Sequence, residues 1–493
     1  MIAQGRRNSM FLVIGLALLI ALSIGSYLWM SWRVLSLGFP LDDAWIHQSY
    51  ARNLALRGEW AFLSGQPSAG STSPLWATAL AGGHILGGDP KAWAYGLGTL
   101  CLGVVAWLGA RWLFLRLSCE RLWLGLAAAM MALEWHLVWA AVSGMEVLAL
   151  GLLATGIFYA LERGQWRISL IGALIGLGVW LRPEAVLLTV AAVWVILTRE
   201  RFHFRTVLVA LVELVIGMSV LVIPYLVFNR ALSGAWWPTT FYAKQAEYAV
   251  LRQASLWRRL IEQAGLPFVG VLVLLLPGIV LGAMSAIRSK QWYRFAPLLW
   301  VCSHLGAYAL RLPLTYQHGR YAMPTVPVLL VLGLEGFLGW VQLDTKPVFK
   351  RVVSRAWLVS VVITAIGFWY LGARAYTQDV AIIQTEMVAS ADWVRENTAK
   401  DALIAAHDIG ALGYFADRDI LDLAGLVDPT VIPFIRDEQA LGELLDERRV
   451  DFLMTFPDWY PQLIVNKIQV FSTSGQFSPL AGGENMVVYK WSE

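Results

Sequence analysis

The chain has 493 residues, of which 58% are hydrophobic and 15% are charged, and it contains 25 Trp. Soluble domains carry roughly 25% charged residues, so this composition excludes a soluble globular protein, and its apolar content excludes a disordered chain. The net charge of +4 conceals an asymmetry, because residues 375–493 hold 19 Asp and Glu against 8 Lys and Arg, whereas residues 1–374 are basic. The two parts are expected to occupy a membrane and water, respectively.

Long apolar runs follow one another through residues 1–374. A membrane-spanning helix needs about 20 such residues, and some of the runs are short enough to need neighbouring helices around them. The first run follows Arg6 and Arg7 and lacks a small-residue cleavage site, so we predict a retained helix rather than a signal peptide. About eleven spans are predicted, at 10–32, 92–115, 122–142, 147–161, 168–181, 185–197, 207–228, 266–287, 295–310, 322–341 and 357–371.

Basic residues gather in alternate loops between these runs. In an eleven-span arrangement they all fall on one side, which the positive-inside rule identifies as the cytoplasm. The sequence therefore predicts a cytoplasmic N-terminus, outer loops at 33–91 and 229–265, and an outer tail. The clusters are Arg6 and Arg7; Arg111, Arg116 and Arg121; Arg163 and Arg167; Arg199, Arg201 and Arg205; Arg288, Lys290 and Arg294; and Lys346, Lys350, Arg351 and Arg355.

The acidic tail alternates short apolar runs with a helical segment. We predict strands at 401–407, 419–423, 451–455 and 485–491 and a helix at 440–448. The expected fold is thus mainly α, a polytopic membrane module at 1–374, followed by a small extracytoplasmic α/β domain at 375–493. The apolar segment 73–87 is too short to span a bilayer and is predicted to lie in the outer interface.

Two adjacent carboxylates, Asp42 and Asp43, begin a helical segment at 42–57 in the first outer loop, and Gly58 would end it. Aspartate is favoured at a helix N-terminus, so a helix start alone explains the pair. A carboxylate beside the bilayer could also act as a general base toward a hydroxyl nucleophile, and repulsion between the two would raise one pKa. The two interpretations are compatible.

Cations on the outer face are exceptions to the positive-inside rule. Three of them lie beside short outer turns, where they either anchor helix ends or bind an anion such as a lipid phosphate: Arg182, Arg311 and Arg320. Lys244 follows the aromatic residues Trp237 and Tyr242. This stretch is either an aromatic belt at headgroup depth or a site where Lys244 neutralises a leaving phosphate while the aromatic rings hold a prenyl chain or a sugar.

Other ionisable residues of the apolar part have weaker interpretations. Glu146, in a tight outer turn, could face Asp42 or Asp43 and hold a divalent cation such as Mg²⁺ or Mn²⁺, and no other cofactor is predicted. His47, His136 and His318 lack metal-site spacing and are predicted to be polar fillers or phosphate donors. Three acids inside the apolar runs are typical of transporters, but without paired Lys or Arg in neighbouring spans we predict structural roles: Glu134, Glu213 and Glu335.

The motifs of the outer face, taken in order, resemble those of the GT-C superfamily of polytopic glycosyltransferases. The string Asp-Asp-Ala-Trp-Ile-His-Gln-Ser-Tyr-Ala-Arg-Asn-Leu at 42–54, followed by Ser-Pro-Leu-Trp at 73–76, is similar to the first outer loop of that superfamily. Further strings resemble the branch near the mycobacterial arabinofuranosyltransferases. They are Ser-Gly-Met-Glu at 143–146, Arg-Pro-Glu at 182–184, Pro-Thr-Thr-Phe-Tyr-Ala-Lys at 238–244, Gly-Arg-Tyr-Ala-Met-Pro at 319–324 and the tail strings at 407–415 and 422–429.

This resemblance implies a site and a mechanism. It implies two juxtamembrane helices, at 42–57 and 73–87, and a catalytic aspartate at Asp42 with Asp43 as its close neighbour. The implied reaction is inverting, with a polyprenyl-phosphate sugar as donor and fixed cations in place of a general acid. The donor phosphate would be held by Arg182, Lys244, Arg320 and His318. The substrate or its lipid carrier would contact Arg52, Trp237, Tyr242, Tyr321 and Glu146.

The leading hypothesis is a multi-pass glycosyltransferase of a bacterial-type cytoplasmic membrane that acts in cell-envelope biogenesis. Its predicted partners are the lipid donor, membrane lipid and a glycan, lipid or protein acceptor, with no nucleic acid. The alternatives are a lipid-linked sugar flippase or proton-coupled transporter, which would need polar residues continuing to the cytoplasmic side, and a non-catalytic assembly protein whose tail binds a partner.

Overall fold

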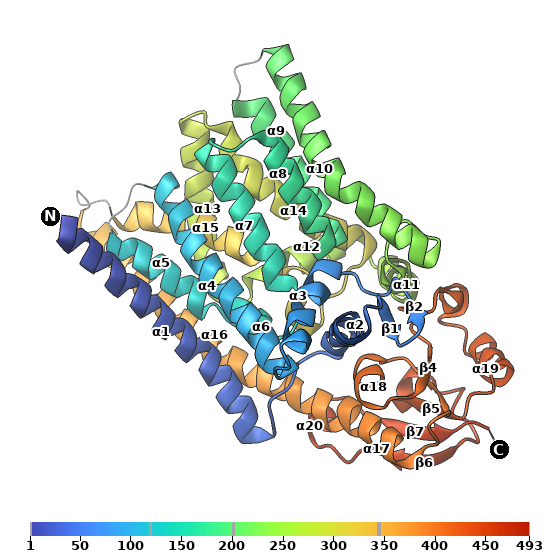
Figure 1. The fold of residues 1–493 in the computed structure, drawn as a ribbon. Coiled ribbons are helices and arrows are strands. Elements are labelled where there is room, and N and C mark those ends of the chain that lie inside the picture. Colours follow the sequence, from blue (N-terminus) through green and yellow to red (C-terminus); the bar gives the residue numbers. More distant parts are fainter. Residues whose placement is uncertain (1, 118–120, 200–202, 343–346, 493) are drawn as a thin grey trace.

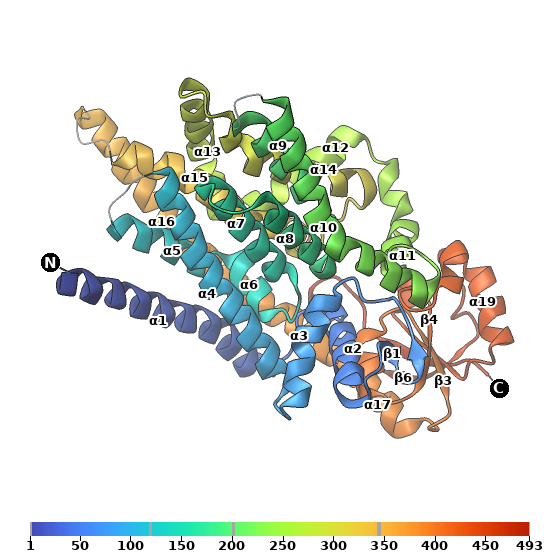
Figure 2. The same ribbon diagram turned by 45° about the horizontal axis from the view of Figure 1, so that its top comes forward.

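The structure is a computed structural model that describes residues 2–117, 121–199, 203–342 and 347–492. It has two parts, a large helical body and a smaller α/β domain formed by the C-terminal end of the chain (Figure 1 and Figure 2). Arg201 and Lys346, two members of the predicted basic loops, lie outside the described residues. The mainly helical fold with a small C-terminal sheet agrees with the predicted fold class in outline.

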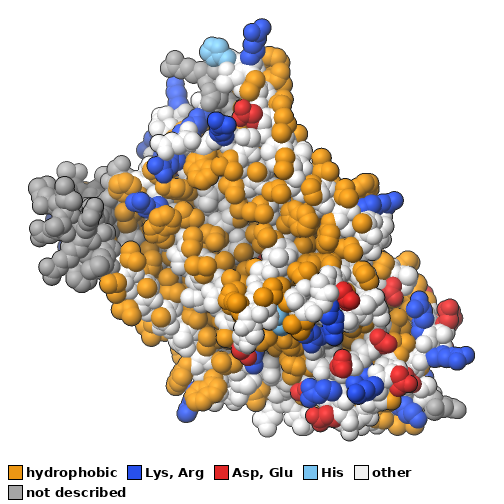
Figure 3. All heavy atoms as spheres, viewed as in Figure 1, with side chains coloured by type: hydrophobic (Ala, Val, Ile, Leu, Met, Phe, Trp, Pro, Cys, Tyr) orange, Lys and Arg blue, Asp and Glu red, His pale blue; other side chains and the backbone are white. Residues whose placement is uncertain are grey.

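The body is built from apolar helices, and each predicted apolar run overlaps at least one of them. Six helices among the described residues are long and apolar enough to cross a membrane, or seven if a bent pair counts as one span. The chain is therefore a multi-pass membrane protein, and hydrophobic side chains are abundant on the face of the body that Figure 3 shows. These helices are α1 (Ile2–Val34), α4 (Pro90–Arg116), the pair α5 (Arg121–Leu133) and α6 (Trp135–Val142), α10 (Phe204–Ser233), α13 (Val271–Arg288), α15 (Val326–Val341) and α16 (Val348–Ile383).

The remaining predicted spans are shorter helices. They are α7 (Val147–Arg163), α8 (Ile168–Leu181), α9 (Leu188–Arg199) and α14 (Ala296–Arg311), and each falls below the roughly 20 residues that cross a bilayer alone. Their neighbours approach closely where glycine leaves room. A Cβ on Gly217 of α10 would overlap the backbone of Ser169 in α8, so only a residue without a side chain allows this contact.

Two of the three acids within the predicted spans, Glu134 and Glu335, have partners in the structure, whereas Glu213 is exposed on its helix. Glu134 breaks the bent pair, because its side chain accepts a hydrogen bond from the backbone of Leu137 (3.0 Å) and so begins α6, 55° from α5. Our prediction that Glu335 lacks a paired cation is wrong. Its carboxylate contacts Arg116 (2.6 Å) and Arg294 (3.3 Å), which stand just beyond the predicted ends of their apolar runs.

Residues 33–91, the predicted first outer loop, contain two helices. α2 (Asp43–Arg57) ends at Gly58, whose φ of 68° is the left-handed conformation that glycine adopts at little cost. α3 (Pro74–Ile85) follows, and between them lies a small hairpin of β1 (Ala61–Leu63) and β2 (Gln66–Pro67) that the sequence did not predict. Residues 229–265, the predicted second outer loop, contain α11 (Thr239–Glu247) and α12 (Leu256–Gly265).

The C-terminal domain is a five-stranded mixed sheet in the order β4-β3-β5-β7-β6. Strand β3 pairs in parallel with β4 and β5, while β7 pairs antiparallel with β5 and β6. The predicted strands and helix are present, and β6 is additional. The bounds are β3 (Leu403–Ala406), α18 (Gly410–Phe415), β4 (Asp419–Asp422), α19 (Glu438–Glu447), β5 (Phe452–Thr455), β6 (Ile468–Ser472), α20 (Phe477–Leu480) and β7 (Val487–Lys490).

Two connections fix this domain to the body. Helix α16 continues without a break past residue 374, and a π-helical turn then leads into α17 (Ala389–Asn397). Helix α18 packs on α2, where Arg52 donates hydrogen bonds to the backbone oxygens of Tyr414 (2.7 Å) and Gly413 (3.2 Å). The first outer loop therefore lies between the apolar helices and the α/β domain (Figure 1).

Candidate active site

Asp42 and Asp43 lie where the first outer loop meets both the body and the C-terminal domain. The two Asp42 carboxylate oxygens accept hydrogen bonds from the backbone N–H groups of Gly410 (2.6 Å) and Ala411 (2.8 Å). Asp42 thus satisfies the free N–H groups at the start of α18 rather than those of its own helix. This contact ties the predicted site to the C-terminal domain.

The Asp43 carboxylate is held by two cations from distant parts of the chain. Its Oδ2 lies 3.2 Å from Nζ of Lys244, on α11, and 2.5 Å from the guanidinium of Arg320, in the turn before α15. The Tyr321 hydroxyl accepts hydrogen bonds from both cations, at 3.3 and 2.9 Å. Burial alone would raise the pKa of Asp43, but the ammonium and the guanidinium outweigh it and hold that pKa well below its usual value.

Asp42 has the opposite electrostatic environment. Burial and the nearby Asp408 carboxylate raise the pKa of Asp42, and the two N–H groups from α18 oppose this only in part. Burial also raises the pKa of Asp408, although His407 beside it acts the other way. The pKa values of the adjacent acids are therefore shifted in opposite directions, upward for Asp42 and downward for Asp43.

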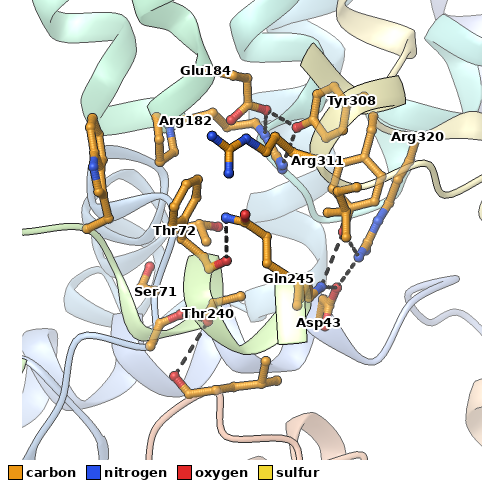
Figure 4. A pocket seen from close by; sticks show the side chains of 18 of the residues that line it. Asp43, Ser71, Thr72, Arg182, Glu184, Thr240, Gln245, Tyr308, Arg311 and Arg320 are labelled. Atoms are coloured by element: carbon orange, nitrogen blue, oxygen red, sulfur yellow. Dashed lines mark hydrogen bonds and ion pairs between the residues drawn. The ribbon is translucent and has the colours of Figure 1, made fainter. Parts of the chain in front are cut away.

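A first cavity of about 330 Å³ lies between α2, α11, α14 and the turn that follows α8 (Figure 4). Much of its wall is apolar, from residues such as Ile46, Trp237 and Phe241. Arg182 lines it but is neutralised, because its guanidinium contacts the carboxylates of Glu146 and Glu184.

Arg311 is the exception among the cations of the first cavity. Its guanidinium points into the cavity (Figure 4), and it has no carboxylate within ion-pair distance in the described part of the chain. Lys244 and Arg320, by contrast, share Asp43. An apolar cavity with one unpaired guanidinium and two cations around a single carboxylate can accept the head of an anionic lipid.

A second cavity, of about 560 Å³, lies between the body and the C-terminal domain. Asp42, Asp43, Lys244 and Arg320 line it together with residues of the domain. Since Asp43, Lys244 and Arg320 also line the first cavity, these three side chains form the boundary between the two spaces. A group bound in one cavity could therefore react with a group bound in the other beside the same carboxylate.

Of the remaining predicted site residues, some line the first cavity or lie behind it, and others lie away from both cavities. Trp237 and Tyr321 line the first cavity, and Glu146 lies behind it, paired with Arg182 and with His47 (3.1 Å). Three others do not line either cavity. Tyr242 packs edge-on against Phe241, His318 contacts Asp379 at 2.8 Å, and Arg52 stacks on Tyr414.

Sequence reasoning assigned no role to several cavity residues, although some of them lie inside the motifs at 182–184 and 407–415. Glu184 and Tyr308 surround Arg182, and His407, Asp408 and Trp459 line the second cavity. Glu184 could have been found as the acid beside an outer Arg, whereas no local signal connects the tail residues to the first outer loop. As for a metal, the described residues contain no group of three or more His, Cys, Asp or Glu that could hold one, and Asp43 and Glu146 are each engaged by cations instead.

The fold is that of the GT-C class of membrane glycosyltransferases, to which the chain is structurally similar over nearly its whole length. ArnT from Cupriavidus metallidurans bound to undecaprenyl phosphate matches with a TM-score of 0.58 and 13% identity, covering 96% of this chain and 97% of that one. AglB from Archaeoglobus fulgidus, in complex with an inhibitory peptide and a dolichol-phosphate, matches with a TM-score of 0.61 and 12% identity, covering 91% of this chain and 69% of that one.

Arabinofuranosyltransferase AftD from Mycobacteria matches with a TM-score of 0.47 and 14% identity, over 96% of this chain and 40% of that one. Residues 374–489 match a family described as a domain of unknown function, DUF8728. No curated protein matches the sequence. At these identities the comparisons establish the fold alone, and the chemistry has to be argued from the side chains.

Proposed function

We propose that this protein is an inverting glycosyltransferase that moves a sugar from a polyprenyl-phosphate donor to a glycan, lipid or protein acceptor. The observation that carries the proposal is the position of Asp43, which lines both cavities while Lys244 and Arg320 hold its carboxylate. A transferase that uses two substrates needs a base at the boundary between them. Support for the donor class comes from two relatives of the same fold, which bind undecaprenyl phosphate and dolichol-phosphate.

In this proposal the first cavity binds the donor. Its apolar wall accommodates the isoprenoid chain, and Arg311, Lys244 and Arg320 bind the phosphate. Arg182 is held by Glu146 and Glu184, so it shapes the wall and contributes little net charge. Because the leaving group departs as a lipid phosphate anion, these cations stabilise the charge that develops on it and no acid is needed to protonate it.

The acceptor hydroxyl then loses its proton to Asp43. The acceptor oxygen attacks the anomeric carbon on the face opposite the phosphate, the bond from that carbon to the phosphate oxygen breaks, and the configuration inverts. A donor phosphate competes with Asp43 for Lys244 and Arg320, which removes part of the positive charge that depresses the pKa of Asp43. Asp43 therefore becomes a stronger base when the donor is bound.

We further propose that the reaction takes place at the outer face of a bacterial-type cytoplasmic membrane, with eleven spans and a cytoplasmic N-terminus. Helix α7 begins beside Glu146, close to the first cavity, and its 17 residues place Arg163 at roughly 25 Å along its axis. The helices α4, α9 and α13 also end in Arg, at Arg116, Arg199 and Arg288. Basic ends opposite the cavities support an outer site.

The test is transfer of radiolabel from a polyprenyl-phosphate sugar by the purified chain in lipid nanodiscs. Replacing Asp43 by Asn should lower the transfer rate by a factor of about 10² to 10⁴, the usual contribution of a general base. Asp42→Asn keeps the side-chain shape and should reduce the stability of the folded protein more than the rate. Asp419→Asn, an exposed acid of β4, is the matched control.

Wild-type-like transfer by Asp43→Asn would refute this mechanism. Movement of the labelled lipid across the bilayer without any transferred product would instead favour the flippase.

A further inference from the structure

The second cavity contains features that the proposed function does not use. Its wall on one side comes from the C-terminal domain, which contributes His407, Asp408, Arg436, Asp458, Trp459 and Tyr460. At about 560 Å³ it is within the usual size range of sites for small ligands. Because Asp43 and the first cavity adjoin it, a ligand here would lie next to the reacting carboxylate.

The charge of the second cavity is unfavourable for an anion. Its described lining residues include six acidic side chains against three Lys and Arg, and the acids remain in excess even though burial raises the pKa of Asp42. Each of these cations already has a carboxylate, since Lys244 and Arg320 contact Asp43, and Arg436 lies 4.0 Å from Glu247. No unpaired guanidinium corresponding to Arg311 of the first cavity exists among the described residues that line the second. A phosphate, sulfate or carboxylate group would therefore enter at an electrostatic cost.

Asp408 offers a vacant hydrogen-bond acceptor at this cavity. Its Oδ2 is buried and has no hydrogen-bond partner in the described structure, although the residue lines the cavity. A buried carboxylate oxygen without a donor costs folding free energy, and a hydroxyl group of a ligand would satisfy it. The arrangement favours a ligand that donates O–H groups.

Trp459 adds an apolar surface to the same wall. Its side chain is 43% exposed although it lies at the cavity. The ring packs edge-on against His407, with ring centroids 4.8 Å apart, and His407 is itself held by the Tyr460 hydroxyl (2.8 Å) and by Glu247 (3.2 Å). An exposed indole beside acidic side chains is suited to stack on the apolar face of a sugar ring whose hydroxyls reach the acids.

We propose that the second cavity binds the acceptor and selects an uncharged glycan, with Trp459 as the stacking surface and Asp408 as a hydroxyl acceptor. This inference rests on the proposed glycosyltransferase function and specifies its acceptor class. It also assigns a role to the domain formed by residues 374–489, which supplies the acceptor-side wall while Asp42 fixes it in place.

The test uses the full-length protein in nanodiscs and an array of oligosaccharides in matched sets: uncharged, phosphate-bearing and carboxylate-bearing. We expect binding to uncharged members at least tenfold tighter than to their phosphorylated forms. Trp459→Ala should weaken this binding about tenfold, whereas Trp459→Phe should retain most of it. Trp166→Ala, a Trp of 44% exposure outside the cavity lining, is the matched control and should bind as wild type does.

A second variant tests the charge argument. Asp408→Asn should weaken binding of uncharged glycans and reduce the discrimination against phosphorylated ones. Asp401→Asn, an exposed acid of the same domain, should change neither.

Binding of undecaprenyl phosphate, measured on the same samples, reports on the first cavity. It should be unchanged in Trp459→Ala, and its loss in that variant would show that Trp459 has only a structural role and so overturn the inference. Preference for anionic glycans, or binding of peptides in place of glycans, would also overturn it, as would no glycan binding by a protein that binds the lipid. Absence of lipid binding by the wild type would instead count against the proposed donor.

Discussion

Asp42 and Asp43 are adjacent in the chain, but their carboxylates make contacts with different parts of the molecule. Both oxygens of Asp42 accept backbone N–H groups of α18, and Oδ2 of Asp43 contacts Lys244 and Arg320. Consecutive residues in the first turn of a helix point in different directions, so one can hold the C-terminal domain while the other faces the cavities. Substitutions at the two positions should therefore separate stability from catalysis.

Arg311 gives a direct test of the donor site. If this unpaired guanidinium binds the donor phosphate, Arg311→Ala should weaken binding of a polyprenyl phosphate by about tenfold to a hundredfold, the usual effect of losing a charge-assisted hydrogen bond. Arg311→Lys should retain part of the affinity, because it keeps the charge but loses bidentate geometry. The measurement is equilibrium binding in nanodiscs at two salt concentrations.

Arg258→Ala is the control for this prediction, because Arg258 is exposed on α12 and pairs with Glu262 away from the cavities. Wild-type affinity in Arg311→Ala would exclude Arg311 from the phosphate site.

Part of the candidate site could be predicted from the charged residues of the sequence. The Asp pair, Lys244 and Arg320 stood out because charge is costly beside a bilayer, and the structure brings Asp43 together with both cations. The contribution of Asp408 was not accessible in this way. It depends on the docking of α18 onto α2, and the Asp42 contact that fixes this docking joins residues 368 positions apart.

At the scale of elements, the contact between α2 and α18 connects the body to the α/β domain. Trp45 of α2 packs against Tyr414 and Phe415 of α18, with ring centroids 4.9 and 4.6 Å apart. The N-terminus of α18 approaches Asp42 so closely that a Cβ on Gly410 would overlap the Asp42 carbonyl oxygen. A glycine is therefore needed at this position for the two helices to approach.

Gly410→Ala tests this contact. We expect a loss of about 1 to 3 kcal/mol in the stability of the docked domain, as is usual for overpacking, together with faster proteolysis between the body and the domain. Gly442→Ala in α19 is the control, because its Cβ would meet only the flexible end of Leu463 and alanine favours a helix. Equal protease sensitivity of the two variants would contradict the importance of this close approach.

Periodic segments were the elements that could be predicted. Each apolar run overlaps a helix. A helix of 12 or more residues that is buried or exposed to lipid requires apolar residues along its length, and the sequence shows them as a recognisable run. The hairpin of β1 and β2 and the strand β6 escaped prediction, since they are short and β6 is largely exposed. The bend between α5 and α6 was also missed. In the sequence Glu134 looks like an acid inside one continuous span, and only the structure shows that its carboxylate accepts the hydrogen bond from Leu137 that begins α6.

At the scale of the whole molecule, charge should set the orientation of the chain. The structure places the helix ends at Arg163 and Arg199 far from the cavities, and charged side chains of both signs are visible over the C-terminal domain (Figure 3). A cysteine placed at Leu480, which is 79% exposed in that domain, should react with an impermeant maleimide added to intact cells. A cysteine at Ser289, beyond the basic end of α13, should react only after permeabilisation.

The native cysteines are replaced by Ala in both of these variants. The reverse labelling pattern would put the cavities in the cytoplasm and exclude an outer-face reaction.

The acids between the two parts should make the stability of the whole molecule depend on pH. Burial raises the pKa of Asp422 to about 6, and it raises the pKa values of Asp42 and Asp408, which also repel each other. Burial would lower the pKa of His407, but its hydrogen bond to Glu247 outweighs this and raises it.

Each of these groups binds its proton more tightly in the folded chain, so the stability that it contributes is present at low pH. This stability is lost as pH rises through the folded-state pKa. Asp43 and Glu247, whose pKa values are lowered, contribute a constant amount above about pH 5 and do not reverse the trend.

Thermal unfolding of the full-length protein should therefore occur at a lower temperature at pH 8 than at pH 6. The loss of unfolding free energy should be on the order of 1 to 3 kcal/mol. Each proton that the folded chain holds and unfolding releases changes this free energy by about 1.4 kcal/mol per pH unit. Asp408→Asn removes one of the repelling carboxylates and should reduce this dependence, whereas Asp401→Asn should leave it unchanged. A midpoint that stays level or rises from pH 6 to pH 8 in the wild type would show that these acids are not packed together where the body meets the domain.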